Sequence, residues 1–229
     1  MSRRVLILSA ALVPVAQAFA QLPPGFEPIF DGRSLSGWHI SETNHHGNTR
    51  SWRAQDGILL GSQDPPKVGG ILLTDRADFR NFEVYVEIQP DYGCDGGLFL
   101  RSTERGEAYQ VMIDFLEGGN VGGIYGERLP EMNRPEAGAG QRLDPGYRRF
   151  WKDGQWNSLR ARIEGDAPHI QVWLNGMQVA NWRAARNYLP EGLTTGHIAL
   201  QIHRANDSFD RWKPGGVHRF RNLGVKVLP

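Results

Sequence analysis

The sequence of 229 residues has one cysteine, Cys94, and no excess of charge of either sign. A single thiol excludes a disulfide within the chain, a cysteine-ligated iron–sulfur cluster and a cysteine-rich zinc site. The 26 Lys and Arg residues are balanced by 25 Asp and Glu residues, which gives a formal net charge of +1. This balance argues against nucleic acid or a membrane surface as a partner. Cys94 is therefore expected to pack in a hydrophobic core.

Long hydrophobic runs are also missing. The main apolar run, residues 5–15, is too short to span a bilayer. Arg3 and Arg4 precede it, and the small-x-small sequence Ala18-Phe19-Ala20 follows it. This order predicts that residues 1–20 are a secretory signal peptide, with cleavage near Ala20 and one periplasmic or secreted domain over residues 21–229. The alternative is a buried N-terminal helix.

Short catalytic motifs are absent: the sequence has no Gly-x-Ser-x-Gly, no His-Glu-x-x-His, no P-loop and no dinucleotide fingerprint. The pair His45-His46 lies in the polar stretch 41–50, and no nearby carboxylate or cysteine completes a metal-ligand spacing. A loop is therefore expected there rather than a metal site. No Asp/Asn-rich loop requires calcium. We expect no cofactor, and a structural or catalytic divalent metal stays open.

Alternating apolar and polar residues are abundant and predict an all-β fold. The segments that alternate are 82–89, 98–101, 109–114, 159–164, 170–175, 198–203 and 220–228. Turn sequences separate them, and Asn175-Gly176 marks the clearest hairpin. The 28 glycines fit many turns, so a single-domain sandwich or barrel is predicted. Only residues 182–188 suggest a short helix.

The side of each strand opposite the apolar set carries unusual chemistry. If these strands adjoin in one sheet, that face combines carboxylates, amides, a histidine, an arginine and aromatic rings. Amides and carboxylates bind hydroxyl groups, and a Trp or Tyr ring packs on the apolar face of a sugar. The residues on this face include Glu83, Tyr85, Glu87, Arg101, Gln110, Asp114, Trp173, Gln201 and His203. The long segment 127–155 is either a loop beside the site or a solvated insertion.

Several motifs resemble, in order, those of the 3-keto-disaccharide hydrolase domain family. The resemblance covers residues 26–228, and the number and order of the motifs make it specific. The segments that carry it include Phe30-Asp31-Gly32-Arg33-Ser34-Leu35-Ser36-Gly37-Trp38, Trp52-Arg53-Ala54-Gln55-Asp56-Gly57, Gly96-Gly97-Leu98-Phe99-Leu100-Arg101, Gly123-Ile124-Tyr125-Gly126 and Phe220-Arg221-Asn222-Leu223.

The resemblance implies a concanavalin A-like jelly-roll β-sandwich of two antiparallel sheets. It also implies an extracytoplasmic enzyme that acts on glycosides whose glucose is oxidised at C3. A ketone at C3 acidifies the C2 proton, so a base can remove that proton and the aglycone can leave from C1, after which water adds back. From the strand faces, Glu87 or Asp114 is the expected base, with Arg101 and His203 as enolate stabiliser or acid. The expected substrate-binding residues are Glu83, Gln110, Tyr125, Trp173 and Gln201, and a core position for Trp173 is equally open.

Two other functions stay open at this stage. The first is ordinary glycoside hydrolysis by two carboxylates, as in laminarinase-type glucanases. Glu83 and Glu87 lie four residues apart, about 13 Å along a strand, which is too far for a retaining pair. The second is a non-catalytic carbohydrate-binding module, because one fold serves several functions. The sequence fixes neither the aglycone nor the oligomeric state.

Overall fold

The computed structural model describes residues 22–114, 119–138, 147–205 and 215–229. The predicted signal peptide, residues 1–20, lies outside the described residues. The described part of the chain contains β-strands and three short 3₁₀ turns and no α-helix. None of its helices is long and apolar enough to cross a membrane. The all-β prediction is confirmed.

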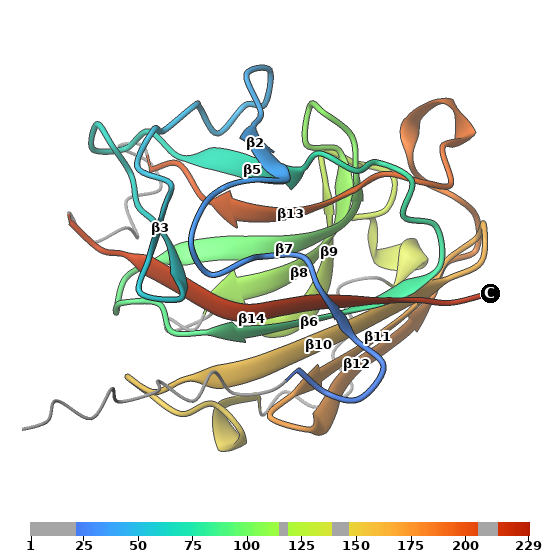
Figure 1. Cartoon of the computed structure of the whole chain (residues 1–229). Helices are drawn as coiled ribbons and strands as arrows, with labels where there is room; N and C mark the ends of the chain where they lie inside the picture. The colour runs from blue at the N-terminus through green and yellow to red at the C-terminus, as the bar shows by residue number, and fades with distance from the viewer. Residues whose placement is uncertain (1–21, 115–118, 139–146, 206–214) are drawn as a thin grey trace, which may run out of the picture.

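The strands form two sheets that pack face to face as a jelly-roll-like sandwich (Figure 1). Every pairing between described strands is antiparallel. The larger sheet has the order β12 (Met177–Arg183), β11 (His169–Leu174), β10 (Asn157–Glu164), β6 (Phe82–Ile88), β14 (His218–Val227), β4 (Ile58–Gly61) and β3 (Arg53–Gln55), with β1 (Glu27–Pro28) beside β14. The smaller sheet has the order β2 (Trp38–Ile40), β5 (Gly70–Thr74), β13 (His197–Ile202), β7 (Asp95–Ser102), β8 (Ala108–Asp114) and β9 (Val121–Glu127).

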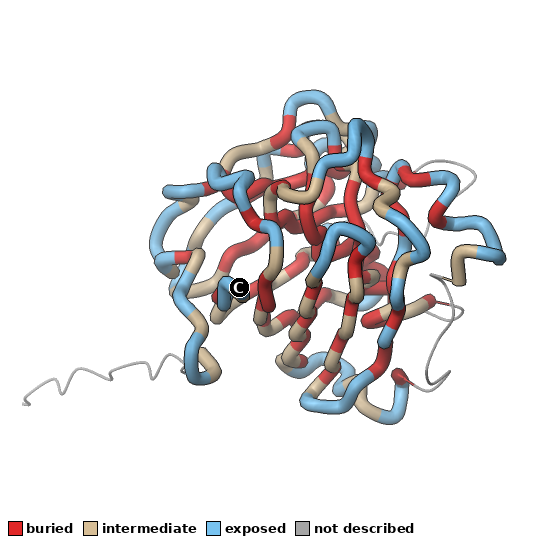
Figure 2. The backbone as a smooth tube through the Cα atoms, turned by 90° about the vertical axis from the view of Figure 1, so that its right-hand side faces the viewer, coloured by how far each residue is buried: buried red, intermediate tan, exposed pale blue. Residues whose placement is uncertain are grey.

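The core lies between the two sheets, and the alternating apolar residues fill it (Figure 2). On β6 these are Phe82, Val84, Val86 and Ile88, each at most 1 % exposed, as the alternation predicts. Cys94 is fully buried in this core, and burial raises the pKa of its thiol to about 12. The thiol is therefore inert at neutral pH, and its expected core position is confirmed.

The hairpin predicted at Asn175-Gly176 joins β11 to β12. Asn175 has a φ of 49° and Gly176 a φ of 83°, the left-handed pair that a tight two-residue hairpin turn requires. The expectation of a short helix over residues 182–188 is wrong. Trp182 belongs to β12, where it is 7 % exposed and pairs with Ile170 of β11.

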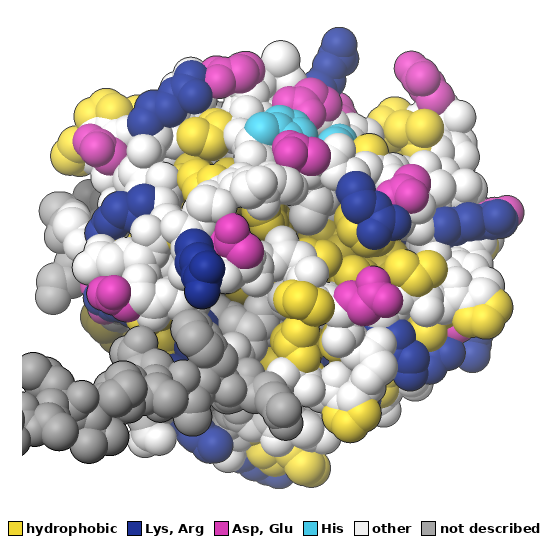
Figure 3. Space-filling view, in the orientation of Figure 1, with side chains coloured by type: hydrophobic (Ala, Val, Ile, Leu, Met, Phe, Trp, Pro, Cys, Tyr) yellow, Lys and Arg dark blue, Asp and Glu magenta, His cyan; other side chains and the backbone are white. Residues whose placement is uncertain are grey.

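A second, smaller apolar cluster lies on the outer face of the smaller sheet. It consists of Ile71, Leu73, Phe99, Ala108 and Ala199. A Cβ added to Gly106 would lie 2.5 Å from Ile71 Cδ1 and 3.7 Å from Asn44 Cβ, so the loop between β2 and β3 approaches this face. The face of the molecule seen in Figure 3 shows acidic and basic side chains interspersed, which agrees with the small net charge.

Candidate functional site

The loop between β2 and β3 is fastened to the smaller sheet. The Ser41 hydroxyl donates to the Glu104 carbonyl at 2.6 Å, and the Gly69 amide donates to the His46 carbonyl at 2.9 Å. Within the loop, the Asn44 side-chain amide donates to the carbonyls of Ser41 and Gly47, both at 2.9 Å, and its oxygen accepts from the His46 amide. These bonds fix the short turn that presents His45 and His46.

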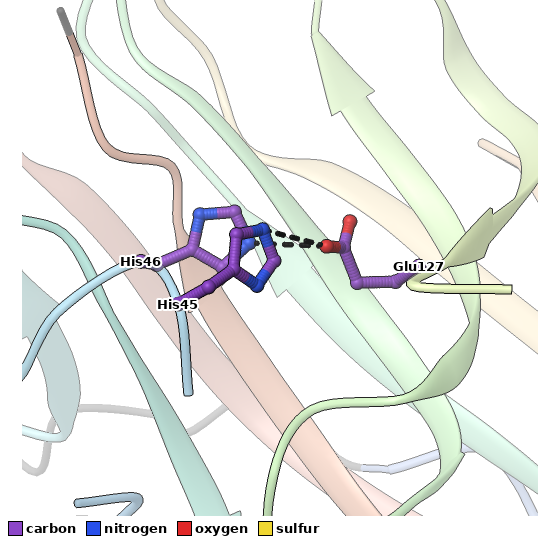
Figure 4. Close-up of side chains that lie close together, drawn as sticks. All are labelled: His45, His46 and Glu127. Atoms are coloured by element: carbon purple, nitrogen blue, oxygen red, sulfur yellow. Dashed lines mark ion pairs between the residues drawn. The ribbon is translucent and has the colours of Figure 1, made fainter. Parts of the chain in front are cut away.

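Both histidines meet Glu127, the last residue of β9 (Figure 4). Nε2 of His45 lies 3.2 Å from Glu127 Oε1, and Nε2 of His46 lies 3.4 Å from the same oxygen. The His203 ring lies next to them, 4.9 Å from the His46 ring between centroids. The side chains of His46 and Glu127 are 1 % and 8 % exposed, whereas that of His45 is 34 % exposed. The His45–His46–His203–Glu127 cluster is therefore buried on one side and reaches solvent through His45.

Burial shifts the pKa of every member toward its uncharged form. Loss of hydration lowers the pKa of His46 to about 3 and that of His45 to about 4, and the neighbouring His46 adds to the effect on His45. The same loss lowers the pKa of His203 and raises the pKa of Glu127, although His45 and His203 oppose the second shift. The histidines are thus neutral at pH 7, so their ring nitrogens offer lone pairs rather than positive charge.

The donor atoms of His45, His46 and Glu127 could hold a divalent metal ion. The three ligand atoms lie within 4.8 Å of one another. Glu127 Oε1 lies 3.2 Å from His45 Nε2 and 3.4 Å from His46 Nε2. Two ligand atoms that are each about 2.1 Å from one tetrahedral ion are separated by a similar distance. Two imidazoles and one carboxylate suit zinc, manganese, iron or cobalt and leave coordination positions for a substrate. The residues present therefore fit such an ion once the Gln201 amide, which lies 2.8 Å from His46 Nε2, turns away from the lone pair of that nitrogen.

A chain of buried amides orients His46. Gln110 Nε2 faces the Gly96 carbonyl at 3.5 Å and donates to Gln201 Oε1 at 3.0 Å. Gln201 Nε2 then lies 2.8 Å from His46 Nε2. Because a carbonyl only accepts, this direction of donation makes His46 Nε2 the acceptor and places the ring proton on Nδ1. Gln110 and Gln201 are 4 % and 0 % exposed, so water does not compete for these bonds.

Nine residues were predicted from the sequence to be catalytic or substrate-binding. Four of them lie on the part of the smaller sheet that carries the histidine cluster. Gln110 and Gln201 form the amide chain, and His203 belongs to the cluster. Tyr125 stands directly opposite Gln110 in the β8–β9 pairing and two residues before Glu127, so it shares their face. Its side chain is 41 % exposed, and burial together with the Glu127 charge raises its pKa.

Glu83, Glu87 and Trp173 belong to the larger sheet instead, which corrects the expectation that all the polar strand faces adjoin. Arg160 and Arg162 approach the Glu83 carboxylate at 3.6 and 3.4 Å. The Arg160 guanidinium also lies 4.0 Å from the centre of the Trp173 ring.

Glu87 on the same sheet has partners of its own. Its carboxylate accepts from Arg221 Nε at 2.6 Å and from the Tyr85 hydroxyl at 3.2 Å. The structure does not bring it, Glu83 or Trp173 to the histidine cluster.

Arg101 is fully buried and bound to main-chain carbonyls. Its guanidinium donates to the Arg80 carbonyl at 2.7 Å and to the Gly165 carbonyl at 2.9 Å, and it approaches Asn81 Oδ1 at 3.4 Å. Its φ of 53° coincides with the irregular pairing between β7 and β13, which turns the side chain out of the simple alternation. Arg101 therefore joins two loops at the end of the sandwich and does not face the cluster.

Asp114 lies on the same strand and the same face as Gln110, but four residues, about 13 Å, further along. It is 3 % exposed and stands opposite Asp95 in the β7–β8 pairing. Asp114 thus lies on the outer face of the smaller sheet but is not part of the histidine cluster.

Sequence reasoning missed the central carboxylate. Glu127 completes the donor set of His45 and His46, which the sequence places in a loop without a metal-ligand spacing. More than eighty residues separate the two segments, so no local spacing links them. The position of Glu127 at the end of a Gly-rich strand, two residues after Tyr125, was the available signal.

The sequence pattern of a domain family described as 3-keto-alpha-glucoside-1,2-lyase-like matches residues 25–226. A comparison with curated proteins finds no match. Among solved structures, two proteins of Parabacteroides distasonis ATCC 8503, provisionally designated glycosyl hydrolases, are 18 % and 20 % identical with TM-scores of 0.58 and 0.59. The first alignment covers 90 % of this chain and 94 % of that one, and the second covers 89 % and 99 %.

The alginate lyase Aly36B is also similar in fold. It is 14 % identical with a TM-score of 0.52, over 78 % of this chain and 84 % of that one. At these identities the likeness establishes the sandwich fold.

Proposed function

Because the chain belongs to the 3-keto-alpha-glucoside-1,2-lyase-like family, we propose that it is an enzyme that cleaves glycosides whose glucose unit is a ketone at C3. Membership of this family supports a carbohydrate-active function. The observation that carries the proposal is the approach of neutral His45 and His46 to the buried carboxylate of Glu127, with the His203 ring packed against His46. Such a constellation of perturbed titratable groups is typical of a catalytic site.

The reaction is an elimination followed by hydration. A base takes the C2 proton, the electrons of that C–H bond form a double bond between C1 and C2, and the C1–O bond breaks. The departing oxygen takes up a proton. Water then adds its hydroxyl to C1 and its proton to C2, so the net change is hydrolysis of the glycosidic bond. The enzyme must therefore supply a base, an acid and a group that stabilises negative charge on the C3 oxygen.

His203 is the base that the geometry favours. Its Nδ1 lies 2.5 Å from the Arg204 carbonyl, which only accepts, so Nδ1 carries the proton and Nε2 has the lone pair. Burial lowers its pKa and keeps the ring neutral at pH 7. Tyr125, which is exposed and lies two residues before Glu127 on β9, is the proposed donor of a proton to the departing oxygen.

His45, His46 and Glu127 are the residues that would hold a divalent cation, which would polarise the C3 carbonyl when bound. The buried amides of Gln110 and Gln201 bind each other and His46, so they orient this ring rather than a sugar hydroxyl. In this proposal Gln201 acts through His46.

Incubation of the purified protein with a 3-keto-α-glucoside, beside its unoxidised parent, tests the proposal. Release of the aglycone from the keto substrate alone is expected. Cleavage of the parent would favour ordinary glycoside hydrolysis, and binding of either sugar with no cleavage would favour a carbohydrate-binding module. The wild type is compared with Glu127→Gln and with the matched Glu87→Gln on the other sheet.

We propose in addition that residues 1–20 direct secretion, which the charged start, the apolar run and Ala18-Phe19-Ala20 support. Expression of the full chain followed by mass measurement of the extracytoplasmic product tests this. A product that begins at Gln21 is expected, and retention of the intact N-terminus inside the cell would contradict it.

A further inference from the structure

His39 lies on β2, which leads into the loop that carries His45 and His46, and both of its ring nitrogens meet carboxylates. Nδ1 lies 2.8 Å from Asp75 Oδ1, and Nε2 lies 3.0 Å from Glu104 Oε2. Asp75 directly follows β5, the partner strand of β2, whereas Glu104 lies in the turn between β7 and β8. One imidazole, in the Asp75–His39–Glu104 clasp, therefore connects three segments of the smaller sheet.

The geometry of the clasp requires a charged ring. A carboxylate only accepts hydrogen bonds, so both nitrogens of His39 donate, and only the protonated imidazole carries a proton on each nitrogen. Partial burial opposes this charge, but the hydrogen bonds to Glu104 and Asp75 outweigh burial and raise the pKa of His39 above its ordinary value. The neutral ring has one N–H and can therefore bind only one of the two carboxylates.

One further titratable ring packs against His39. The His197 ring of β13 meets it edge-on, with 5.7 Å between the ring centroids. Nδ1 of His197 lies 2.6 Å from the Thr74 carbonyl, so this nitrogen carries a proton and donates. Among the described residues, the titratable groups that face His39 are thus the two carboxylates and this ring. Loss of the His39 proton therefore acts on the two carboxylates.

Glu104 is the carboxylate that a neutral ring releases. Asp75 is held beside β2 by its own main chain, because its amide donates to the Gly37 carbonyl at 2.8 Å. Its carboxylate also makes the shorter of the two contacts with the ring. The Glu104 side chain belongs to a turn and is 48 % exposed, so water replaces the ring as its partner at little cost.

The main chain of Glu104 holds the loop that presents the histidine pair. Its carbonyl accepts from the Ser41 hydroxyl at 2.6 Å and lies 3.5 Å from the Thr43 hydroxyl. The side chain of the same residue binds His39, so Glu104 is fastened to β2 and to the start of the loop at once. When the side-chain bond is lost, the turn is held by fewer bonds, and residues 41–50 open locally more often.

We propose that His39 is a positioning residue: its charged form clasps Glu104 and so fixes residues 41–50, and its neutral form releases them. This inference rests on the proposed function only for its effect on activity, because the clasp itself needs no substrate. Since the pKa of His39 is higher in the folded chain than near 6.5 in the unfolded one, the clasp is closed below about pH 6.5 and opens as the pH rises through the folded-state pKa. His45 and His46, with pKa values of about 4 and 3, stay neutral over this range and do not cause the change.

Amide hydrogen exchange of residues 41–50 in the metal-free protein tests the clasp. After correction for the intrinsic exchange rate, protection in the wild type is expected to fall about threefold between pH 6 and pH 9, which is the scale of a partly exposed ion pair. His39→Gln does not titrate, so its protection in this segment should not depend on pH. Residues 157–164 of β10 provide the internal reference, with no change expected in either protein.

His169→Gln is the matched control. The His169 ring also bonds a side-chain oxygen, Asn181 Oδ1 at 2.6 Å, but it lies on the larger sheet, so this variant should behave like the wild type. Glu104→Gln keeps the carbonyl that holds Ser41 and removes the charge, so it should also lose the pH dependence, and it replaces His39→Gln if that variant fails to fold. Protection that does not depend on pH in the wild type, or an unchanged dependence in either clasp variant, would overturn the inference.

Kinetics separate this inference from the proposed function. On a 3-keto-α-glucoside, the ratio of wild-type kcat/KM to that of His39→Gln is expected to fall about threefold between pH 6 and pH 9, whereas the ratio to His169→Gln stays constant. A constant ratio for His39→Gln would contradict the positioning role. If the exchange difference is found but no keto substrate is cleaved, the clasp stands and the proposed function fails. If keto substrates are cleaved but exchange in the wild type does not depend on pH, the reaction stands and the clasp is wrong.

Discussion

Gln201 donates its side-chain amide to His46 Nε2 across 2.8 Å, and both side chains are almost completely buried. His46 Nδ1 has no hydrogen-bond partner among the described residues, so only the Nε2 side selects the tautomer. The tautomer of His46 is therefore determined by the chain of hydrogen bonds that begins at the Gly96 carbonyl and passes through Gln110 and Gln201 to the imidazole. A ring held in this way gives the one lone pair of Nε2 to the Gln201 amide, and Glu127 Oε1 lies 3.4 Å from the same nitrogen.

The tautomer of His46 is the first testable consequence. In metal-stripped protein we expect the proton on Nδ1, and long-range ¹H–¹⁵N NMR of the ring distinguishes the two nitrogens. Gln201→Glu replaces the donor by an acceptor and should move the proton to Nε2. A wild-type ring with the proton on Nε2 would contradict the direction of the amide chain.

The substitutions Glu127→Gln and Glu87→Gln test which of the two sheets carries the catalytic site. Both remove one carboxylate charge, but only Glu127 meets the histidines. We expect kcat to fall by about a hundredfold or more in Glu127→Gln, as when a central group of a catalytic site is removed, and to change by less than about twofold in Glu87→Gln. Steady-state kinetics on a 3-keto-α-glucoside checks this, with unfolding midpoints of both variants as the control. Comparable losses of kcat in both variants would contradict a catalytic site on the smaller sheet.

Metal binding should stabilise the fold through the same three residues. A cation at about 100 times its Kd stabilises the folded state by about 2.7 kcal/mol, because it binds the folded chain and not the unfolded one. Thermal unfolding with added Zn²⁺ or Mn²⁺ after chelator treatment measures this. We expect the wild type to gain stability and His46→Ala and Glu127→Gln to gain little. An equal gain in all three proteins would place the ion elsewhere.

His218 makes stability depend on pH. It is fully buried, its Nε2 lies 3.1 Å from the Asp95 carbonyl, and burial lowers its pKa to about 4. The unfolded chain, with a histidine pKa near 6.5, binds more protons than the folded chain between about pH 6.5 and 4. Stability is therefore complete above pH 6.5 and falls as the pH drops through this window. The contribution of this one group is at most about 3 kcal/mol.

Urea unfolding at pH 7 and pH 4.5 measures the effect. We expect His218→Gln, which keeps an amide donor but does not titrate, to lose less stability than the wild type between the two pH values. His45 and His46 add to the slope in both proteins, because their folded-state pKa values of about 4 and 3 are also lowered. The same slope in variant and wild type would show that His218 is not buried as a neutral ring.

Arg101 is expected to support the fold rather than the reaction. Arg101→Met leaves the carbonyls of Arg80 and Gly165 without their donor, and it should cost about 3 kcal/mol or more of unfolding free energy. Arg101→Lys should also be destabilised, since one ammonium cannot reproduce the planar fork of donors. Urea unfolding and the kcat of the folded protein are measured together. A stable but inactive Arg101→Lys variant would instead support the catalytic role that the sequence predicts for Arg101.

The local sequence predicts the strands because each carries its own signal. The alternation over Phe82–Ile88 and the left-handed pair Asn175-Gly176 specify a strand and a turn without reference to the rest of the chain. The sequence does not predict which strands pair. Glu87 and Glu127 both lie at outward strand positions, yet the pairing of β6 with β10 and β14, and of β9 with β8, sends them to opposite faces of the molecule.

The site depends on this pairing, so only part of it could be predicted. Gln110, Gln201 and His203 were found because they alternate with core residues along two strands of one sheet, and Tyr125 was found through the family motif Gly123-Ile124-Tyr125-Gly126. The His45–His46 turn and Glu127 come together through a loop held by Asn44 and Ser41, and no periodicity encodes that contact. Arg101 was misplaced because a left-handed residue breaks the alternation on which the expectation depended.

β9 is the outermost strand of the smaller sheet, and Glu127 is its final residue. The segment that follows it is anchored, because Leu129 and Met132 are buried in the main core and Asn133 Oδ1 accepts from the Gly126 amide at 2.8 Å. Between these anchors Arg128 and Glu131 are exposed. Substitutions at these two positions therefore change the surface beside the site while His45, His46 and Glu127 keep their positions.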